Sequence, residues 1–230
     1  MLITEQLPQR GNVARSDDEK FRADVLGSGL SQPTRPVILD DKFFRIVPTL
    51  GPLHGHHLLV CARRDRSGIH QMNAPELSRL QSILASVERV YSNIHGKKFV
   101  MFENGTHSAG QGGCSIRHFH LHVVPTKRAF NERGSSERGF QVVETLSAAK
   151  RMATLLGDYQ LMKIPNGKFL IRSRGKMPSQ YLRRRVAELN GIAEWDWRKI
   201  GNTNDWSQYS MEYTSIRAAL MRDASANASH

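Results

Sequence analysis

Apolar residues between positions 36 and 125 fall in short runs separated by polar turns, a pattern typical of β-strands. The runs that predict strands are 37–39, 43–47, 57–61, 98–102 and 117–125. An acidic turn at Asp40 and Asp41 separates the first two runs. Because successive apolar strands joined by short turns are typical of antiparallel pairing, we expect an antiparallel sheet.

One long segment, residues 74–95, instead repeats apolar residues at steps of three and four, which predicts an amphipathic helix. Its apolar stripe consists of Leu77, Leu80, Ile83, Leu84, Val87, Val90, Tyr91 and Ile94. Asn73 and Glu76 have the spacing of a capping box, and Gly96 follows the helix. We expect the stripe to pack on one face of the sheet, which leaves the other face or its rim for a functional site.

The chain changes character after Pro125. The expected elements are a helix over 144–157, a hairpin of strands 159–164 and 168–172, and a helix over 179–190. Pro165, Asn166 and Gly167 are typical turn residues at the tip of that hairpin, and Gly191 ends the last helix.

The predicted fold class is α+β, with three parts along the chain. Residues 1–31 are expected to form a polar N-terminal arm, with a short helix near 17–25. Residues 32–143 are expected to form the core, which contains the antiparallel sheet and the long packing helix. Residues 144–230 are expected to form a basic α/β C-terminal extension whose tail, 224–230, frays.

The chain is strongly basic. Lys and Arg total 33 against 21 Asp and Glu, which gives a formal net charge of +12. Residues 126–200 hold sixteen Lys and Arg against seven Asp and Glu, so most of the surplus lies in this part. Such a surplus suits a polyanionic partner, and the alternative is a solvated basic surface that only aids solubility.

Only two cysteines occur, Cys61 and Cys114, so nothing resembles a disulfide framework and a reducing compartment is expected. The first residues lack the basic region and apolar run of a secretory signal. No apolar stretch approaches the roughly 20 residues of a membrane span. We therefore expect a cytoplasmic protein with no membrane partner.

The residues with the clearest chemical potential are His118, His120 and His122, which alternate along the run 117–125. Alternate side chains of a strand share a face, so the three imidazoles would line one side while the apolar residues between them enter the core. Such a row suits proton transfer, nucleophilic attack or metal binding. Backbone N–H groups of the preceding glycine-rich turn, 110–115, could converge on an anion.

A metal site is the competing interpretation of the histidine row. Cys114, His107 and one histidine of the row would be the ligands. The sequence has no CxxC pair and no spacing typical of a closed zinc site. We therefore expect no metal and no other cofactor.

The motif His118-x-His120-x-His122, followed by two apolar residues, resembles the signature of the histidine-triad (HIT) superfamily of nucleotide hydrolases and transferases. Residues 55–60 resemble the family's strand that carries a further active-site histidine, and residues 102–105 resemble its segment that brings an amide to the substrate phosphates. The resemblance covers residues 36–125 and implies a HIT-like antiparallel sheet.

The resemblance also implies roles for individual residues. His120 would be the nucleophile and would form a nucleotidyl-histidine, a phosphoramidate. His118 would orient the ring of His120. His122 would contact the transferring phosphate, and His56 would complete the cluster. The implied phosphate-binding residues are Ser115, Gly113, Asn104 and Gln111. For Asn104 the alternative is an ordinary turn residue beside glycine.

Two departures from the best-known members concern substrate recognition. Those members place a Gln four residues before the first triad histidine, where this chain has Cys114. Their residue for the ribose hydroxyls lies eight residues before the position of His56, where this chain has Pro48. We therefore expect base and ribose recognition to differ from those members.

The helix expected over 179–190 could give the extension a role at the site. Its N-terminal amides favour an anion, and basic residues follow along it. The residues of this expected leaving-group clamp are Ser179, Gln180, Arg183 and Arg184. The alternative is that a solvated basic helix merely docks the extension on the core.

The sequence therefore predicts a HIT-type hydrolase that cleaves the α-phosphate linkage of a nucleotide conjugate through nucleotidyl-His120. Dinucleoside polyphosphates, nucleoside phosphoramidates and nucleotidylated metabolites are the candidate substrates. The alternatives are a nucleotidyltransferase or phosphorylase with the same intermediate, or a non-catalytic nucleotide- or nucleic-acid-binding module. The intact triad argues against nucleic acid as the partner. A homodimer is expected only by analogy with similar proteins.

Overall fold

The structure is a computed structural model that describes residues 36–107, 118–128, 139–175, 177–178, 180–200 and 210–228. The N-terminal arm, with the helix expected near 17–25, lies outside the described residues. The glycine-rich turn 110–115 also lies outside them. Nowhere in the described ranges does a helix combine the length and apolarity needed to cross a membrane.

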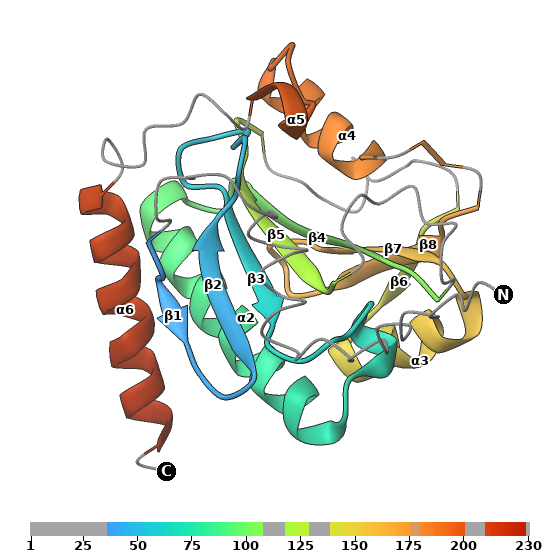
Figure 1. Cartoon of the computed structure of the whole chain (residues 1–230), viewed down its shortest axis with the longest axis horizontal. Coiled ribbons are helices and arrows are strands. Elements are labelled where there is room, and N and C mark those ends of the chain that lie inside the picture. Colours follow the sequence, from blue (N-terminus) through green and yellow to red (C-terminus); the bar gives the residue numbers. More distant parts are fainter. Residues whose placement is uncertain are drawn as a thin grey trace, which may run out of the picture.

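Strands and helices are mixed along the chain, as the α+β prediction requires (Figure 1). The strands are β1 (Leu39–Asp40), β2 (Phe44–Pro48), β3 (Leu58–Ala62), β4 (Phe99–Gly105), β5 (His120–Pro125), β6 (Gln141–Val143), β7 (Tyr159–Lys163) and β8 (Phe169–Ser173). The helices are the 3-10 turn η2 (Ile69–Gln71), α2 (Ala74–His95), α3 (Leu146–Leu156), α4 (Tyr181–Asn190), α5 (Trp197–Ile200) and α6 (Ser210–Ala228). The predicted order of the core, three strands, a helix and two strands, is confirmed.

The eight strands form one antiparallel sheet in the order β1-β2-β3-β5-β4-β7-β8-β6. The predicted hairpin of β7 and β8 is confirmed, and its strand β7 pairs with β4 of the core. The strands of the extension therefore continue the sheet of the core. The division of the chain into arm, core and extension stays a prediction.

Strand β4 is longer than the sequence predicted. We expected it to end at Phe102, but it runs to Gly105 because Asn104 pairs with Gln160 and Gly105 with Tyr159. A side chain at Gly105 would lie 2.1 Å from the Tyr159 ring, so only glycine fits this close pairing. Asn104 is therefore a strand residue with a defined face, rather than a turn residue.

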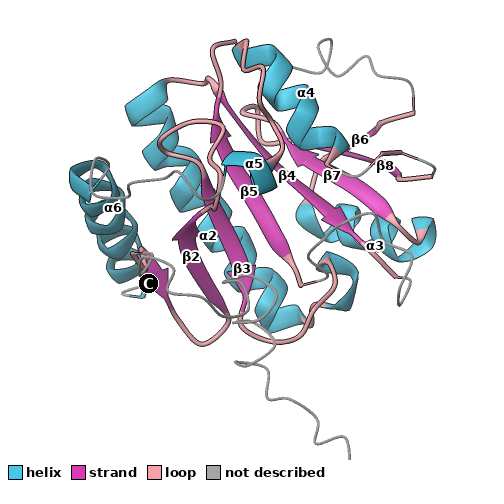
Figure 2. Ribbon diagram, turned by 45° about the horizontal axis from the view of Figure 1, so that its top comes forward, coloured by secondary structure: helices cyan, strands magenta, loops and turns pink. Residues whose placement is uncertain are grey.

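The long helix α2 begins and packs as predicted. The Asn73 side chain accepts a hydrogen bond from the Glu76 backbone N–H, and the Glu76 carboxylate accepts one from the Asn73 N–H. This confirms the capping box, which typically stabilises a helix by about 1 kcal/mol. The apolar stripe of α2 packs against one face of the sheet, where α3 and α6 also lie, except for its last residue, Ile94, which is exposed (Figure 2).

Helix α6 was not among the elements expected from the sequence. It is helical through Ala228, and its residues Tyr213, Ile216 and Leu220 are buried against the core. These residues recur at steps of three and four, so they share one face of the helix. Tertiary packing of this stripe, rather than intrinsic propensity, stabilises the helix.

The two faces of the sheet differ in what covers them. On the first, Val60, Leu121 and Val123 join the large core under α2, α3 and α6. On the second, Phe102 and Val124 join a smaller core under α4. We call the second face, which is covered by α4, the α4 face.

Candidate active site

The middle and last histidines of the row lie on the α4 face. His120 pairs with Cys61 across the sheet, and His122 pairs with Leu59 on one side and Phe102 on the other. Their neighbours Leu121 and Val123 point into the large core. The alternation predicted from the sequence therefore separates these two imidazoles from the packing residues of the same strand.

The protonation of His120 follows from one backbone hydrogen bond. Its Nδ1 lies 2.7 Å from the carbonyl oxygen of His118, which can only accept. Nδ1 therefore carries the proton, and the neutral ring keeps its lone pair on Nε2. Burial lowers the pKa of His120, although the bond to the His118 carbonyl partly offsets this effect. The net effect favours the neutral form of the His120 ring.

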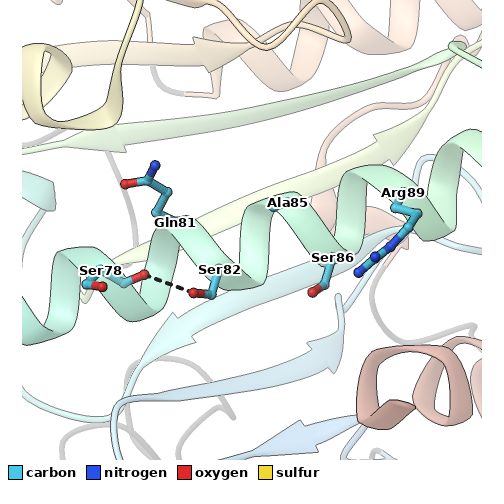
Figure 3. Close-up of a pocket in the computed structure, with 6 residues that line it drawn as sticks. All are labelled: Ser78, Gln81, Ser82, Ala85, Ser86 and Arg89. Carbon is cyan, nitrogen blue, oxygen red and sulfur yellow. Dashed lines mark hydrogen bonds between the residues drawn. The ribbon is translucent and has the colours of Figure 1, made fainter. Parts of the chain in front are cut away.

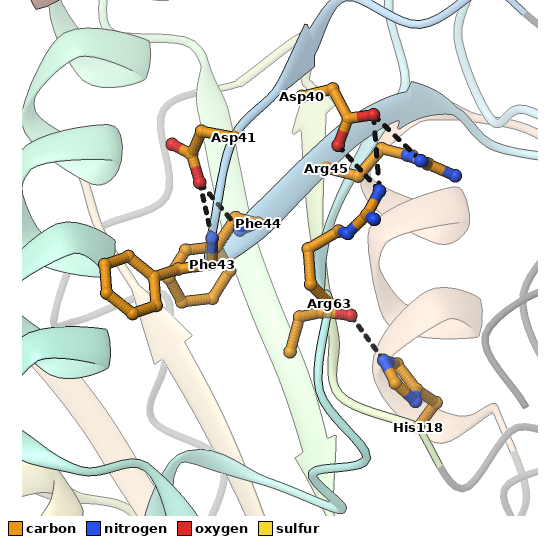
Figure 4. Close-up of polar contacts among 8 residues, drawn as sticks. Asp40, Asp41, Phe43, Phe44, Arg45, Arg63 and His118 are labelled. Atoms are coloured by element: carbon orange, nitrogen blue, oxygen red, sulfur yellow. Dashed lines mark hydrogen bonds and ion pairs between the residues drawn. The ribbon is translucent and has the colours of Figure 1, made fainter. Parts of the chain in front are cut away.

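His118 itself precedes β5, which begins at His120. Its ring is buried, and Nε2 donates to the backbone oxygen of Ala62 at the end of β3. Figure 4 shows this bond, together with the ion pairs of Asp40 with Arg45 and Arg63 that link β1, β2 and the end of β3. Its backbone carbonyl is the group that binds Nδ1 of His120, and the orienting role implied by the resemblance stays a prediction.

The histidine that donates a hydrogen bond to His122 is His57, not His56. The backbone N–H of Leu53 donates to Nδ1 of His57 at 3.2 Å, so the proton of neutral His57 is on Nε2. That Nε2 lies 2.9 Å from Nδ1 of His122 and donates to it. Neutral His122 therefore carries its own proton on Nε2, which is free to act as a donor. Its ring is stacked on Phe102, with centroids 4.5 Å apart.

The structure places His56 away from the histidines of β5. Nδ1 of His56 lies 2.9 Å from Nε2 of His95 at the end of α2, and the His54 ring packs beside both. His56 lies in the turn that precedes β3, and His57 follows it directly before the strand begins at Leu58. The pairing of Leu59 with His122 puts the odd-numbered residues of β3 on the α4 face. His57, not His56, therefore joins the histidines of β5.

Burial and a nearby cation keep this histidine pair neutral. Burial lowers the pKa of His57 and of His122 well below the ordinary value, and the Arg183 cation lowers both further. Arg183 is itself buried, and its guanidinium donates to the backbone oxygens of Gly51 and Trp195. This arginine fixes the loop before His57 and adds positive potential near His122.

The expected leaving-group clamp is only partly brought to the triad. Arg183 lies close enough to influence His57 and His122, whereas Arg184 is exposed and pairs with Glu188 one turn along α4. The Gln180 side chain donates to Asp196. Ser179 lies outside the described residues. Arg183 is thus the one member of the clamp that the structure relates to the histidines.

The expected phosphate-binding residues divide in the same way. Asn104 lies on the α4 face, two positions along β4 from Phe102, and its Oδ1 accepts a hydrogen bond from Gln160. Ser115, Gly113 and Gln111 lie outside the described residues, as does Cys114 of the competing metal set. The contribution of the glycine-rich turn stays a prediction.

No group of three or more His, Cys, Asp or Glu side chains in the described part of the chain is arranged to hold a metal ion. His107, a ligand of the competing metal set, stacks on His70 and bonds to the backbone oxygen of Ala153 on α3. Nothing in this arrangement brings His107 to the histidines of β5.

A large hollow on the outer surface of α2 is unrelated to the histidines (Figure 3). Its lining residues are Ser78, Gln81, Ser82, Ala85, Ser86 and Arg89. Since α2 covers the face of the sheet opposite to His120, we assign this hollow no part in the chemistry.

Sequence reasoning missed His57, Gln160 and the burial of Arg183. The adjacent histidines at 56 and 57 were a usable signal, because only one of them can face the triad. Choosing between them required the register of β3 on β5. Gln160 was recognisable only as a strand residue, since its partner Asn104 lies 56 positions earlier in the chain.

Comparison with known protein families finds a match over part of the chain. The model of a family described as scavenger mRNA decapping enzyme C-term binding matches residues 28–136. No curated protein matches the sequence.

Several solved structures are similar in fold. A hypothetical histidine triad nucleotide-binding protein from Sulfolobus tokodaii is 20% identical over 44% of this chain and 66% of its own, with a TM-score of 0.34. A zinc-bound histidine triad family protein from Mycobacterium smegmatis is 21% identical over 57% of this chain and 92% of its own, with a TM-score of 0.35. A DUF4931 family protein from Bacillus cereus is 9% identical over 79% of this chain and 99% of its own, with a TM-score of 0.44.

Proposed function

This chain is a member of the HIT-like superfamily, and from this premise we propose its function. We propose that it hydrolyses the α-phosphate linkage of a nucleotide conjugate through a covalent nucleotidyl-His120 intermediate. The observation that carries the proposal is the hydrogen bond from His120 Nδ1 to the His118 carbonyl, which leaves the lone pair on Nε2. A buried neutral imidazole with a defined lone pair is an effective nucleophile toward phosphorus.

In the first step, Nε2 of His120 attacks the α-phosphorus. The P–N bond forms as the bond from phosphorus to the leaving group breaks, and the leaving group departs with the electron pair and takes a proton from water. The phosphorylated ring is cationic, and its Nδ1–H remains bonded to the His118 carbonyl. In the second step, water attacks phosphorus, the P–N bond breaks, the lone pair returns to Nε2 and a proton passes to solvent.

His122 and Arg183 support the charge that develops on the phosphoryl group. The Nε2–H of His122 donates to a phosphoryl oxygen, and His57 holds the ring in the required tautomer. The buried Arg183 cation adds positive potential that favours the negative charge of the phosphoryl group, and it stays protonated throughout. From the sequence, Ser115, the Gly113 backbone and Gln111 are further candidate donors to the phosphate.

Moving the additional active-site histidine to His57 changes the ribose assignment. The family position lies eight residues earlier, which is now Thr49 rather than Pro48. Thr49 is buried, and its backbone N–H bonds to the His57 carbonyl at 3.1 Å. We therefore assign ribose contact to the hydroxyl at Thr49.

The proposal is tested by incubating the protein with dinucleoside polyphosphates, including a cap-like dinucleotide, and with nucleoside phosphoramidates. Mass spectrometry of the quenched protein should find a nucleotidyl adduct on His120, and chromatography should find a nucleoside monophosphate. The variant His120→Gly should give neither. Turnover by His120→Gly at the wild-type rate would reject the mechanism.

The same experiment separates the alternatives. Products that change when phosphate or another acceptor is added would identify a phosphorylase or transferase. Nucleotide binding without turnover or adduct would identify a non-catalytic module. A homodimer stays a prediction, and sedimentation velocity tests it directly.

A further inference from the structure

Three side chains form a hydrogen-bonded row across the α4 face from β8 to β4. Arg172 on β8 pairs with Gln160 on β7, which pairs with Asn104 on β4. The Arg172 guanidinium donates to Gln160 Oε1 from Nε at 3.0 Å and from Nη2 at 2.7 Å. Gln160 Nε2 in turn donates to Asn104 Oδ1 at 3.0 Å.

The chemistry of arginine fixes the direction of this row. A guanidinium has only donors, so the Gln160 atom that faces it must be the oxygen. The amino group of Gln160 can then only donate to Asn104, which must present its own oxygen. Asn104 is therefore obliged to turn its amino group, Nδ2, away from Gln160. In the part of the chain that the structure describes, this amino group makes no hydrogen bond.

Burial holds the row in this arrangement. Gln160 is 0% exposed and Arg172 is 4% exposed. The guanidinium lies over the Phe140 ring at 4.3 Å and over the Tyr181 ring at 5.0 Å. Reversing either amide would leave buried polar atoms facing groups of the same kind, which is unfavourable because a buried polar group without a hydrogen-bond partner has also lost its contact with water.

The free end of the row lies at the level of the nucleophile. Phe102 of β4 pairs with His122 of β5, and Asn104 is two residues further along the same face. Continuing this antiparallel register places Asn104 beside His120. The N–H groups of Asn104 are thus displayed where the reacting phosphate would lie.

We infer that Gln160 and Arg172 are positioning residues that make Asn104 an obligate hydrogen-bond donor to the substrate. Position 104 then selects an acceptor oxygen, on the transferring phosphate or on the leaving group next to it. The inference rests on the proposed function. Both positioning residues lie beyond residue 136, where the family match ends, so the extension helps to define the site.

The sharpest variant is Gln160→Glu, which reverses the polarity of the row with almost no change in volume. A carboxylate still accepts from Arg172, but it can only accept from Asn104. Asn104 must then flip and present its oxygen to the phosphate. We expect KM and the Kd for AMP to rise about tenfold, with a smaller change in kcat, because a charge-assisted hydrogen bond is replaced by a repulsive contact. The matched control is the single variant Arg172→Lys. It keeps a cation that can only donate, so it should retain most of the wild-type affinity for AMP.

Two readouts separate this role from a structural one. In the Asn104→Ala background, adding Gln160→Glu should change KM by less than twofold, because its effect acts through Asn104. The side-chain NH₂ signal of Asn104, identified by its loss in Asn104→Ser, should shift on addition of AMP in wild type. In Gln160→Glu it should not shift. If Gln160→Glu does not fold, Arg172→Met replaces it and should weaken AMP binding about threefold by freeing the Gln160 amide.

The inference is overturned if the Asn104 NH₂ signal ignores AMP, or if Gln160→Glu raises KM equally with and without Asn104. A wild-type protein that forms no adduct and turns over no conjugate would instead refute the proposed function. The AMP titration would still decide whether the row orients Asn104.

Discussion

The two faces of the sheet use the same strands for different purposes. The face under α2, α3 and α6 is lined by apolar side chains such as Leu121 and Val123. The α4 face is apolar under α4 but carries His120, Asn104, Gln160 and Arg172 towards one end. A strand can therefore serve stability and chemistry at once, since its alternate residues belong to different environments.

The adjacent residues His56 and His57 show how much depends on the face. His57 is held between the Leu53 N–H and His122, so its donor direction is fixed. His56 bonds to His95 at the end of α2 and packs beside His54. Both groups bring imidazoles together. Only the His57–His122 group includes a residue of β5, the strand on which His120 keeps a lone pair on Nε2.

Replacing neighbours on β5 gives the largest contrast between the faces. His120→Gly should lower kcat/KM by about 10³-fold or more, because the nucleophile is lost while the fold is kept. Leu121→Ala should destabilise the fold by about 2–5 kcal/mol and leave kcat/KM of the folded protein almost unchanged. Kinetics and denaturant unfolding of both variants measure this. A similar loss of kcat/KM in the two would contradict the separation of faces.

The pair His57→Phe and His56→Phe gives the next largest contrast. His57→Phe removes the donor that fixes the tautomer of His122, and we expect kcat/KM to fall about 10–100-fold, the usual loss for an orienting partner. His56→Phe should change kcat/KM less than threefold, since its ring lies towards α2. Steady-state kinetics decide between them, and a larger loss in His56→Phe would restore the original assignment.

Two neighbouring arginines of α4 test how the extension is attached. Arg183→Met leaves the Gly51 and Trp195 carbonyls without their donor and should cost about 2–3 kcal/mol of unfolding free energy. Arg184→Met breaks an exposed ion pair with Glu188 and should cost less than about 0.5 kcal/mol. Urea unfolding measures both. Equal costs would show that Arg183 is not the docking residue.

The smallest effect expected is a shift of the acidic limb of kcat/KM. Attack requires neutral His120, so activity is lost as pH falls through its pKa. Burial lowers that pKa below the ordinary value for histidine, so activity should persist below the pH at which an exposed histidine becomes protonated. A pH profile of kcat/KM measures the limb. A midpoint above 7 would show that His120 is not held neutral by burial.

The sequence by itself determined the local elements and the chemistry of the triad strand. Periodicity placed α2, and the residues Asn73 and Glu76 placed its start. Alternation along β5 separated the histidines from the core residues. These features depend on near neighbours in the chain, so a single sequence suffices to read them.

Tertiary structure decided which residues share the site. Which of the adjacent residues His56 and His57 meets His122 was decided by the turn before β3 and by the register of β3 on β5. Pairing with β7 made Asn104 a strand residue, and docking of α4 buried Arg183. Each of these outcomes depends on contacts between residues far apart in the chain, about which local pattern carries no information.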